Sequence, residues 1–319
     1  MLRAELRIAG CGYAVRLLLV PAACVCCLYK QEEAGKIGDV AIERNAGRLM
    51  ASDSTKVSGT QALALQSSLL LAAGFRHGMS LRAGGSSSAP FDSLNLGRDL
   101  GDAPEQVQDN HRRLAASLGY SCARLFELSQ VHGSAVHIAH PEQSPERFRQ
   151  RQGDAIVVRH HGLAAGVRVA DCIALLLANP ATGGAAAVHA GWRGLVSGVI
   201  AAAVAVLAGP GRGAGARVLA AVFPHIRACC FEVGQDVATE LAGAAGDQRV
   251  VDRRRPRPRV SLSAVARAQL RACGLGSERI EDIDGCTRCE PERFFSYRRD
   301  GPRSGRHLAV VVGRRAGQR

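Results

Sequence analysis

Two short apolar runs and the turn between them decide the fold class of this chain: Ala174-Leu-Leu-Leu-Ala178, then Asn179-Pro-Ala-Thr-Gly-Gly184, then Ala185-Ala-Ala-Val188. Apolar runs of this length, bounded by turn residues, are typical of β-strands. The cluster of Asn, Pro and Gly between them marks a tight connection. The segment therefore predicts two strands that pair as an antiparallel hairpin.

Outward from this hairpin, the pattern is that of a compact α/β chain. Further apolar runs predict strands, and apolar residues at helical spacing predict helices. The sequence has no internal repeat and no low-complexity linker after residue 71, so one domain is the simplest account. The predicted strands are Ala155–Val158, Ala164–Val169, Val218–Val222 and Leu308–Val312, the predicted helices are Pro104–Leu118, Leu195–Leu207 and Ser261–Cys273, and the predicted loops are Arg82–Pro90 and Val250–Arg259.

Composition places the chain among ordinary globular proteins. It has 319 residues, of which 47% are hydrophobic and 22% are charged, which excludes collagen, coiled coil and wholesale disorder. No uncharged apolar run reaches the roughly 20 residues that a membrane helix needs, so we expect no membrane partner. The 11 cysteines are odd in number and irregularly spaced, which argues against a disulfide scaffold and favours a reducing, cytoplasmic setting.

The net charge of +13 resembles that of a nucleic-acid-binding protein, but we do not expect a nucleic-acid partner. Only three of the 41 basic residues are lysines, and Arg, Ala and Gly share GC-rich codons, so genomic composition explains much of the excess. Aromatic residues make up 4% of the chain, which leaves few surfaces on which bases stack. A basic surface still favours small anionic substrates such as phosphate.

Residues 1–70 differ from the rest and are expected to form a poorly ordered N-terminal extension, with the working protein starting near Met50. The apolar run Leu17–Leu28 follows a few arginines, as in a signal peptide. The long, mixed segment before it fits a signal peptide poorly, so the extension is the favoured interpretation.

Three residues stand out as candidates for chemistry. His132 lies in Gln130-Val-His-Gly133, Cys172 follows Asp171, and His189 starts the segment His189-Ala-Gly-Trp-Arg-Gly194. The hairpin places Cys172 and His189 almost opposite each other, where Cβ atoms lie about 4.5–5.5 Å apart. Such a pair suits a shared metal ion or a Cys–His nucleophile pair. A buried cysteine beside a structural histidine is the alternative that spacing alone leaves open.

Two further motifs have less specific patterns. Cys286-Thr-Arg-Cys289 is half of a zinc motif or a redox pair, but the sequence holds no second motif of this kind. The adjacent Cys229 and Cys230 are not expected to be its partners, so a structural role is favoured. In Phe294-Phe-Ser-Tyr-Arg-Arg-Asp-Gly301 and the following Gly305-Arg306, the arginines are either solvated or bind phosphate, with Arg298 and Arg306 among the candidates.

Taken together, these blocks resemble the YfiH-like laccase-domain family, historically called multicopper polyphenol oxidases and now regarded as zinc-dependent purine nucleoside enzymes. The resemblance implies an α+β (mixed α/β) single domain over residues 71–316, with mixed β-sheets layered with helices. It rests on blocks in the family's order: His77-Gly78, Arg82-Ala-Gly-Gly85, Ser93-Leu-Asn-Leu-Gly97, Gln130-Val-His-Gly133, Gly153-Asp-Ala155, Ala170-Asp-Cys172, Val188-His-Ala-Gly-Trp-Arg-Gly194, Phe231-Glu-Val-Gly234 and the segment Cys286–Arg306.

The resemblance also implies a set of site residues. His132, Cys172 and His189 would bind Zn²⁺, with Cu²⁺ as a second candidate, and would leave one tetrahedral position open, as catalytic zinc requires. The implied reactions are phosphorolysis of adenosine, inosine, guanosine and methylthioadenosine to base and ribose 1-phosphate, and deamination of adenosine to inosine. Asp171 would orient a ligand or protonate the leaving base. The implied substrate and phosphate contacts are Arg82, Asn95, Gln130, Arg193, Arg298 and Arg306.

Three other functions remain open at this stage. A cysteine hydrolase (amidase) that edits peptidoglycan precursors would use Cys172 as nucleophile and His189 as base. A copper polyphenol oxidase ranks lower, because multicopper electron transfer needs more ligands than one trio supplies. A non-enzymatic binding protein stabilised by zinc would hold its ion with all four positions occupied.

Overall fold

The structure, a computed structural model, describes residues 62–211 and 213–317. The run Leu17–Leu28, Met50 and the rest of the expected extension up to residue 61 lie outside the described residues. Residues 62–70, also assigned to that extension, contribute a strand and the start of a helix to the fold, and Leu70 is buried. The fold therefore begins before the boundary that we expected at residue 71.

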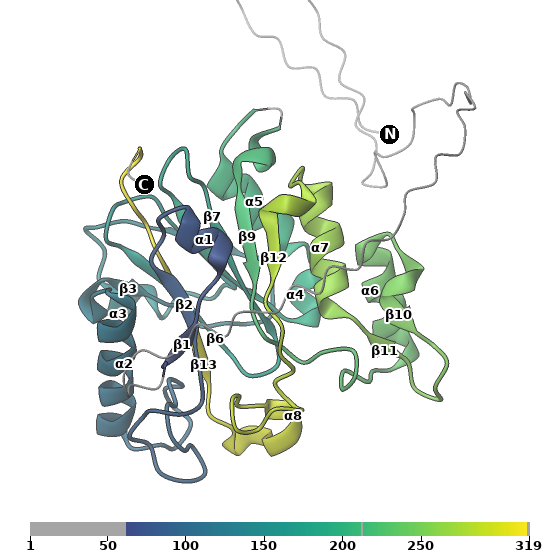
Figure 1. Ribbon diagram of the computed structural model, residues 1–319, viewed down its shortest axis with the longest axis horizontal. Coiled ribbons are helices and arrows are strands. Elements are labelled where there is room, and N and C mark those ends of the chain that lie inside the picture. Colours follow the sequence, from purple (N-terminus) through teal and green to yellow (C-terminus); the bar gives the residue numbers. More distant parts are fainter. Residues whose placement is uncertain (1–61, 212, 318–319) are drawn as a thin grey trace, which may run out of the picture. The chain divides into compact units, whose positions relative to one another are not determined.

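Two mixed β-sheets form the centre of the fold (Figure 1). The five-stranded sheet has the order β1(Ala64–Leu65), β2(His77–Ser80), β13(His307–Val312), β6(Ala164–Val169), β3(Leu125–Phe126). The six-stranded sheet has the order β12(Ile280–Asp282), β9(Leu219–Val222), β7(Ile173–Ala178), β8(Ala185–Ala190), β5(Ala155–Val158), β4(Val136–Ala139). A separate antiparallel pair joins β10(Val251–Asp252) to β11(Arg259–Val260).

Helices cover the outer faces of these sheets. The helix α2 packs on the five-stranded sheet, whereas α4, α5, α6 and α7 pack on the six-stranded sheet. The expected architecture of one domain with mixed sheets and helical layers is confirmed. The helices are α1(Ser68–Ala72), α2(Pro104–Leu118), α3(Pro145–Phe148), α4(Trp192–Val196), α5(Val199–Ala208), α6(Gln235–Ala245), α7(Leu262–Ala272) and α8(Tyr297–Asp300).

The central strands are apolar throughout because both of their faces are covered. In β7, Ile173, Leu175 and Leu177 face the helices, and the residues between them face the other sheet. In β13, Leu308 and Val310 pack toward α2, and the intervening Ala309 packs between the sheets. Successive strand residues point to opposite faces, so a strand that is covered on both sides needs no polar alternation.

Two sequence predictions about individual elements were wrong. The helix expected over Leu195–Leu207 is two helices, α4 and α5, because Gly198 adopts φ +80° and ends the first of them. A left-handed residue of this kind breaks the hydrogen-bond ladder, and glycine adopts it without steric cost. The loop expected over Val250–Arg259 contains the strand β10 and the start of β11.

Apart from His189, four histidines are buried in the described part of the chain: His77, His111, His225 and His307. Burial lowers the pKa of each of them, to about 4 for His111 and to about 3 for His307. The ring Nε2 of His307 accepts a hydrogen bond of 2.8 Å from the backbone N–H of Phe295, which requires that nitrogen to be unprotonated. A neutral His307 thus connects the loop at Phe295 to the strand β13.

The hairpin expected around residues 179–184 is formed by β7 and β8, with Ala178 opposite Ala185. The start of β7, the end of β8 and the start of β5 lie at the same edge of the six-stranded sheet. This edge brings together loops that are far apart in the sequence. Among the described residues, no helix is long and apolar enough to cross a membrane.

Candidate functional site

His132, Cys172 and His189 converge at this sheet edge. We call them the trio. The candidate ligand atoms of the three side chains all lie within 4.8 Å of one another, and the two imidazole rings are 4.7 Å apart between centroids. His189 is buried, Cys172 is half-buried and His132 is exposed, so the site opens to solvent on the His132 side. The structure thus brings together the three residues that the sequence singled out.

The hairpin register differs slightly from the one expected. Ile173 pairs with Ala190 and Ala174 with His189, so His189 is not opposite Cys172. Cys172 precedes β7 and lies level with Gly191, which follows β8. The two functional side chains are therefore diagonal neighbours across the hairpin end, and they meet because the residue between them is a glycine.

Gly191 is required by this close packing. A Cβ atom at this position would lie 2.7 Å from Nδ1 of His132 and 3.0 Å from Sγ of Cys172, closer than carbon atoms approach such groups. Its φ of −70° is open to any residue, so the requirement comes from space and not from backbone strain. The same glycine is the N-cap of α4.

Two residues of the site have strained backbone conformations. His132 adopts φ +59° and Asp171 adopts φ +99°, values that are rare for residues other than glycine. Such conformations persist only where surrounding contacts enforce them, and they concentrate at functional sites. Here they turn His132 and the segment before Cys172 toward the common centre.

Asp154 enforces the conformation at His132, and sequence reasoning gave it no role. Its Oδ1 accepts hydrogen bonds from Nδ1 of His189, at 2.7 Å, and from the backbone N–H of His132, at 3.0 Å. Its Oδ2 accepts the backbone N–H of Gly133 at 2.7 Å. Because Nδ1 of His189 is thereby engaged as a donor, Nε2 is free to bind a metal ion or a proton. The only sequence signal was an acidic residue directly before β5.

Charge interactions in the trio favour an ionised thiol. Burial alone would raise the pKa of Cys172, but the neighbouring His189 and a hydrogen bond with His132 outweigh it and lower this pKa to about 6. Burial alone would lower the pKa of His189, but the charge of Cys172 and the hydrogen bond to Asp154 raise it to about 9. Without a metal ion, the two groups form a thiolate–imidazolium pair.

The donor set fits a zinc ion. Two imidazole nitrogens and one thiolate sulfur are the ligands that zinc prefers, and three protein ligands are the number found at catalytic zinc sites. The carboxylate of Asp154 behind His189 is the outer partner that metal-binding histidines commonly have. The same donors also suit copper, so the residues indicate a metal site without deciding the ion.

The carboxylate of Asp171 accepts three hydrogen bonds from residues outside the trio. Its Oδ1 accepts the hydroxyls of Thr287, at 2.6 Å, and Ser296, at 2.7 Å. Its Oδ2 accepts the backbone N–H of Arg298 at 2.6 Å. With these three donors in place, Asp171 anchors the segment 287–298 beside Cys172.

Three of the expected substrate contacts are already engaged within the protein. Gln130 uses both ends of its amide on the backbone of Arg168, at 2.8 Å each, and so pins the loop that carries His132 to β6. Asn95 is buried and accepts the backbone N–H of Arg306 at 2.9 Å.

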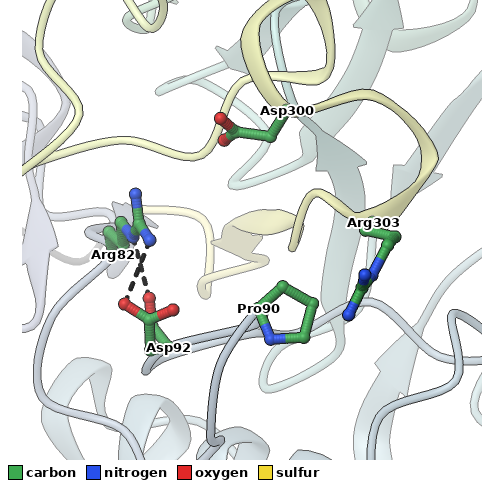
Figure 2. Close-up of a pocket in the computed structure, with 5 residues that line it drawn as sticks. All are labelled: Arg82, Pro90, Asp92, Asp300 and Arg303. Atoms are coloured by element: carbon green, nitrogen blue, oxygen red, sulfur yellow. Dashed lines mark hydrogen bonds and ion pairs between the residues drawn. The ribbon is translucent and has the colours of Figure 1, made fainter.

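Arg82 forms an ion pair of 3.0 Å with Asp92. Figure 2 shows this ion pair in a pocket whose lining residues, which include no trio member, are Arg82, Pro90, Asp92, Asp300 and Arg303.

The remaining three arginines are better placed for an anion. Arg193 is exposed and stacks its guanidinium on Trp192 at 4.6 Å, and this guanidinium forms no hydrogen bond or ion pair with any described residue. Arg298 is exposed, and one of its guanidinium nitrogens donates to the carbonyl of Glu232 at 3.0 Å. Burial lowers the pKa of Arg306 and the charges of Asp171 and Cys172 oppose that effect, while one of its guanidinium nitrogens donates to the carbonyls of Ser304, at 2.6 Å, and Gly305, at 3.1 Å.

A second group of metal-binding side chains lies apart from the trio in the described part of the chain. Cys229, Cys230, Cys286 and Cys289 have their four sulfurs within 4.8 Å of one another, and we call them the cysteine cluster. The expectation that Cys229 and Cys230 would not partner Cys286 and Cys289 was therefore wrong. The two pairs lie on loops after β9 and β12, and these strands are parallel neighbours in the sheet.

Comparison with known proteins assigns the family. The model of the multi-copper polyphenol oxidoreductase laccase family matches residues 76–314, which include the trio and the cysteine cluster. The chain belongs to this laccase family. The resemblance inferred from the sequence blocks is thus confirmed, and the family is one associated with metals.

Named relatives of this laccase-family chain include bacterial proteins. It is 38% identical over 244 residues to a purine nucleoside phosphorylase of Deinococcus radiodurans, covering 76% of this chain and 91% of the relative. It is 36% identical over 231 residues to the purine nucleoside phosphorylase YfiH of Escherichia coli, covering 69% and 87%. The crystal structure of YlmD from Geobacillus stearothermophilus matches with a TM-score of 0.71 and 28% identity, over 80% of this chain and all of that one.

Proposed function

We propose that this protein is a zinc-dependent purine nucleoside enzyme. In the proposed reactions it cleaves adenosine, inosine, guanosine and methylthioadenosine with phosphate, and it deaminates adenosine to inosine. The observation that carries the proposal is the trio: two imidazoles and one thiol around a common point, open to solvent on one side. The relatives named purine nucleoside phosphorylase support the substrate class.

The residues of this chain have distinct tasks in the proposal. His132, Cys172 and His189 hold the ion, and Asp154 fixes the tautomer of His189 so that Nε2 faces the ion. A bound zinc ion would supply a Lewis acid with one open coordination position. The thiol of Cys172 is ionised near neutral pH, so little free energy is lost on deprotonating it for binding.

Phosphorolysis breaks the bond between the base nitrogen and C1′ of the ribose, and an oxygen of phosphate forms the new bond to C1′. The leaving base takes up a proton. The dianionic phosphate needs cations near the ribose, and Arg193, Arg298 and Arg306 are the candidates because they keep donors free or lie beside the trio. Guanidinium groups suit this role because their paired N–H donors match phosphate oxygens.

A cysteine hydrolase acting on peptidoglycan precursors is the second candidate, and one observation favours it. The thiolate–imidazolium pair of Cys172 and His189, with Asp154 behind the imidazole, has the order of groups found in cysteine nucleophile sites. This function would need Cys172 but no metal ion. The free state of all seven described cysteines supports a reducing, cytoplasmic location for either function.

One experiment tests the proposal and separates the candidates. Purified protein is incubated with adenosine with and without phosphate, in each case before and after removal of metal by a chelator. Adenine formed only with phosphate reports phosphorolysis, and ammonia with inosine reports deamination. We expect both activities to vanish with the chelator and to return with zinc. Nucleoside turnover that persists in metal-free protein, or its absence in zinc-loaded protein, would overturn the proposal.

A further inference from the structure

We propose that Cys229, Cys230, Cys286 and Cys289 bind one zinc ion at a second, closed and structural site. The proposal concerns the cysteine cluster alone and is independent of the function proposed for the trio. It starts from the spacing of the sulfurs. The distances from Sγ of Cys229 are 3.7 Å to Cys230, 3.5 Å to Cys286 and 3.6 Å to Cys289, and Cys230 lies 3.2 Å from Cys289.

These distances match a tetrahedral thiolate site. Four sulfurs at about 2.3 Å from one zinc ion stand about 3.8 Å apart at tetrahedral angles. Two sulfurs in a disulfide are only about 2.05 Å apart. The sulfurs of the cluster are thus well beyond disulfide bonding and slightly inside the zinc spacing, and all four surround one point. Four uncharged thiols gain little from such crowding, whereas four thiolates gather around a cation.

The backbone holds both cysteine pairs in place. The strands β9 and β12 run parallel, and a bridge continues their pairing to His225 and Cys286. The backbone N–H of Arg227 points at Sγ of Cys286, at 3.5 Å, and the N–H of Cys289 closes the turn on the carbonyl of Cys286, at 3.1 Å. The turn Cys286-Thr-Arg-Cys289 thus has the compact form in which two cysteines of a zinc site share one ion.

Access and charge also suit an ion at this place. Cys229 and Cys289 are exposed, Cys230 is half-buried and Cys286 is buried, so an ion can reach the cluster from solvent. A tetrathiolate zinc site carries a net charge of about −2. The guanidinium of Arg299, which forms an ion pair of 2.9 Å with Asp300, donates to the carbonyls of Thr287, at 2.8 Å, and Arg288, at 3.3 Å, and so holds the turn in place.

The site would support the trio from behind. Thr287 lies between Cys286 and Cys289, and its hydroxyl donates to Asp171, the residue before Cys172. An ion that fixes the turn therefore also fixes one of the donors that hold Asp171 at φ +99°. Four protein ligands leave no open position, so the ion has a structural role and not a catalytic one.

The test measures zinc per chain in full-length protein purified under reducing conditions. His189→Ala provides a background in which the trio is disabled. We expect this variant to keep about one zinc per chain and the triple variant His189→Ala/Cys229→Ser/Cys289→Ser to lose it. Cys122→Ser in the same background is the matched control, because Cys122 is an exposed cysteine outside the cluster, and should keep the zinc. Because the comparison counts one ion lost with the cysteine pair, it stands even if the trio binds no metal.

A second measurement covers the case in which the cysteine variant fails to fold. In the His189→Ala background, Co²⁺ replaces zinc, and the cluster should give the intense thiolate-to-cobalt absorption of an all-sulfur tetrahedral site. Cys289→His keeps a ligand at an exposed position and should shift this spectrum without loss of the ion. The proposal would be overturned by any of three results. The first is an equal zinc content in the triple variant and in the His189→Ala background. The others are a cobalt spectrum that Cys289→His does not shift, and a disulfide within the cluster in place of the ion.

Discussion

The trio and the cysteine cluster both contain cysteine thiols, but they differ in the number and kind of ligands that they offer to a metal ion. The trio combines one thiol with two imidazoles at the edge of the six-stranded sheet, and it offers three ligands. The cluster offers four thiols from two loops. Because zinc takes four ligands in both kinds of site, the number supplied by the protein decides whether a position is left for substrate. The number of protein ligands, and not the presence of cysteines, therefore distinguishes a site that could leave a position for substrate from a closed one.

The largest expected effect is a loss of nucleoside turnover when the trio, but not the cysteine cluster, is altered. His189→Ala removes a buried ligand of the trio, so we expect the nucleoside kcat/KM to fall at least about a thousandfold, or about 4 kcal/mol in transition-state free energy. Cys289→Ser, in the cluster, should keep that activity within about tenfold, because it touches no trio residue. Steady-state kinetics with adenosine and phosphate measure both. A fully active His189→Ala enzyme would remove the trio from the chemistry.

A smaller effect should follow from crowding the trio. Gly191→Ala would place a methyl group 2.7 Å from Nδ1 of His132, so the ligands must separate. We expect the zinc affinity of the trio to fall about 10–100-fold, with the zinc of the cluster unchanged. Competition with a chromophoric chelator measures both affinities.

Gly243→Ala is the matched control for this change. Gly243 lies in α6, and a Cβ atom there would meet nothing within 4 Å. This substitution should raise the free energy of unfolding by about 0.5–1 kcal/mol and leave the zinc affinity of the trio as it is. Equal affinities for the two glycine variants would show that the close packing at Gly191 is not needed.

A still smaller change in zinc affinity should follow from substitution of the carboxylates next to the trio and next to the cysteine cluster. Asp154→Asn removes the charge that orients His189, and we expect a trio zinc affinity about 10-fold lower, at the small end of the range for such outer partners. Glu290 accepts the backbone N–H of Cys286 at 2.7 Å. Glu290→Gln keeps an acceptor and should change the zinc affinity of the cluster by less than about threefold, because a neutral acceptor replaces a charged one outside the ligand set. The same chelator competition reports both. A larger loss in Glu290→Gln than in Asp154→Asn would contradict this ranking.

The last prediction concerns the reactivity of two thiols in metal-free protein and involves neither zinc affinity nor turnover. A lowered pKa means that the thiolate of Cys172 forms as the pH rises through about 6, well below the ordinary value of 9.0. Hydrogen bonding to Cys230 raises the pKa of Cys289 to about 11, so its thiolate forms only in strong alkali. Pulsed alkylation followed by peptide mass spectrometry should therefore label Cys172 before Cys289 at pH 7. Labelling in the opposite order would contradict the charge pairing in the trio.

Local sequence predicted much of the fold. The strands β5 and β6 and the helix α2 have the expected bounds, because apolar spacing and a proline at the helix start are local signals. The break between α4 and α5 was missed, because Gly198 lies within an otherwise unbroken helical pattern of Ala and Val. The spacing of apolar residues does not record the positive φ of Gly198 that separates the two helices.

The candidate site was only partly predictable for the same reason. Cys172 and His189 were found because they lie at the end of one hairpin, and His132 was found from its motif Gln130-Val-His-Gly133. Asp154 acquires its role from the register of β5 with β8, in which Ala155 lies opposite Val188. The cysteine cluster depends on the parallel pairing of β9 with β12, whose partners are 60 residues apart at Ala220 and Ile280. Arg82 was expected at substrate, but its ion pair with Asp92 becomes visible only in three dimensions.

The neutral histidines of the core make the folded protein less stable in acid. His77, His111, His225 and His307 bind protons in the unfolded chain near the ordinary pKa of 6.5, whereas burial lowers their pKa in the folded protein. Below pH 6.5 the unfolded chain therefore binds more protons than the folded protein. The free energy of unfolding falls as the pH is lowered further. The stabilising contribution of these groups is complete above pH 6.5 and is lost progressively toward pH 4, so mild acid alone should favour denaturation.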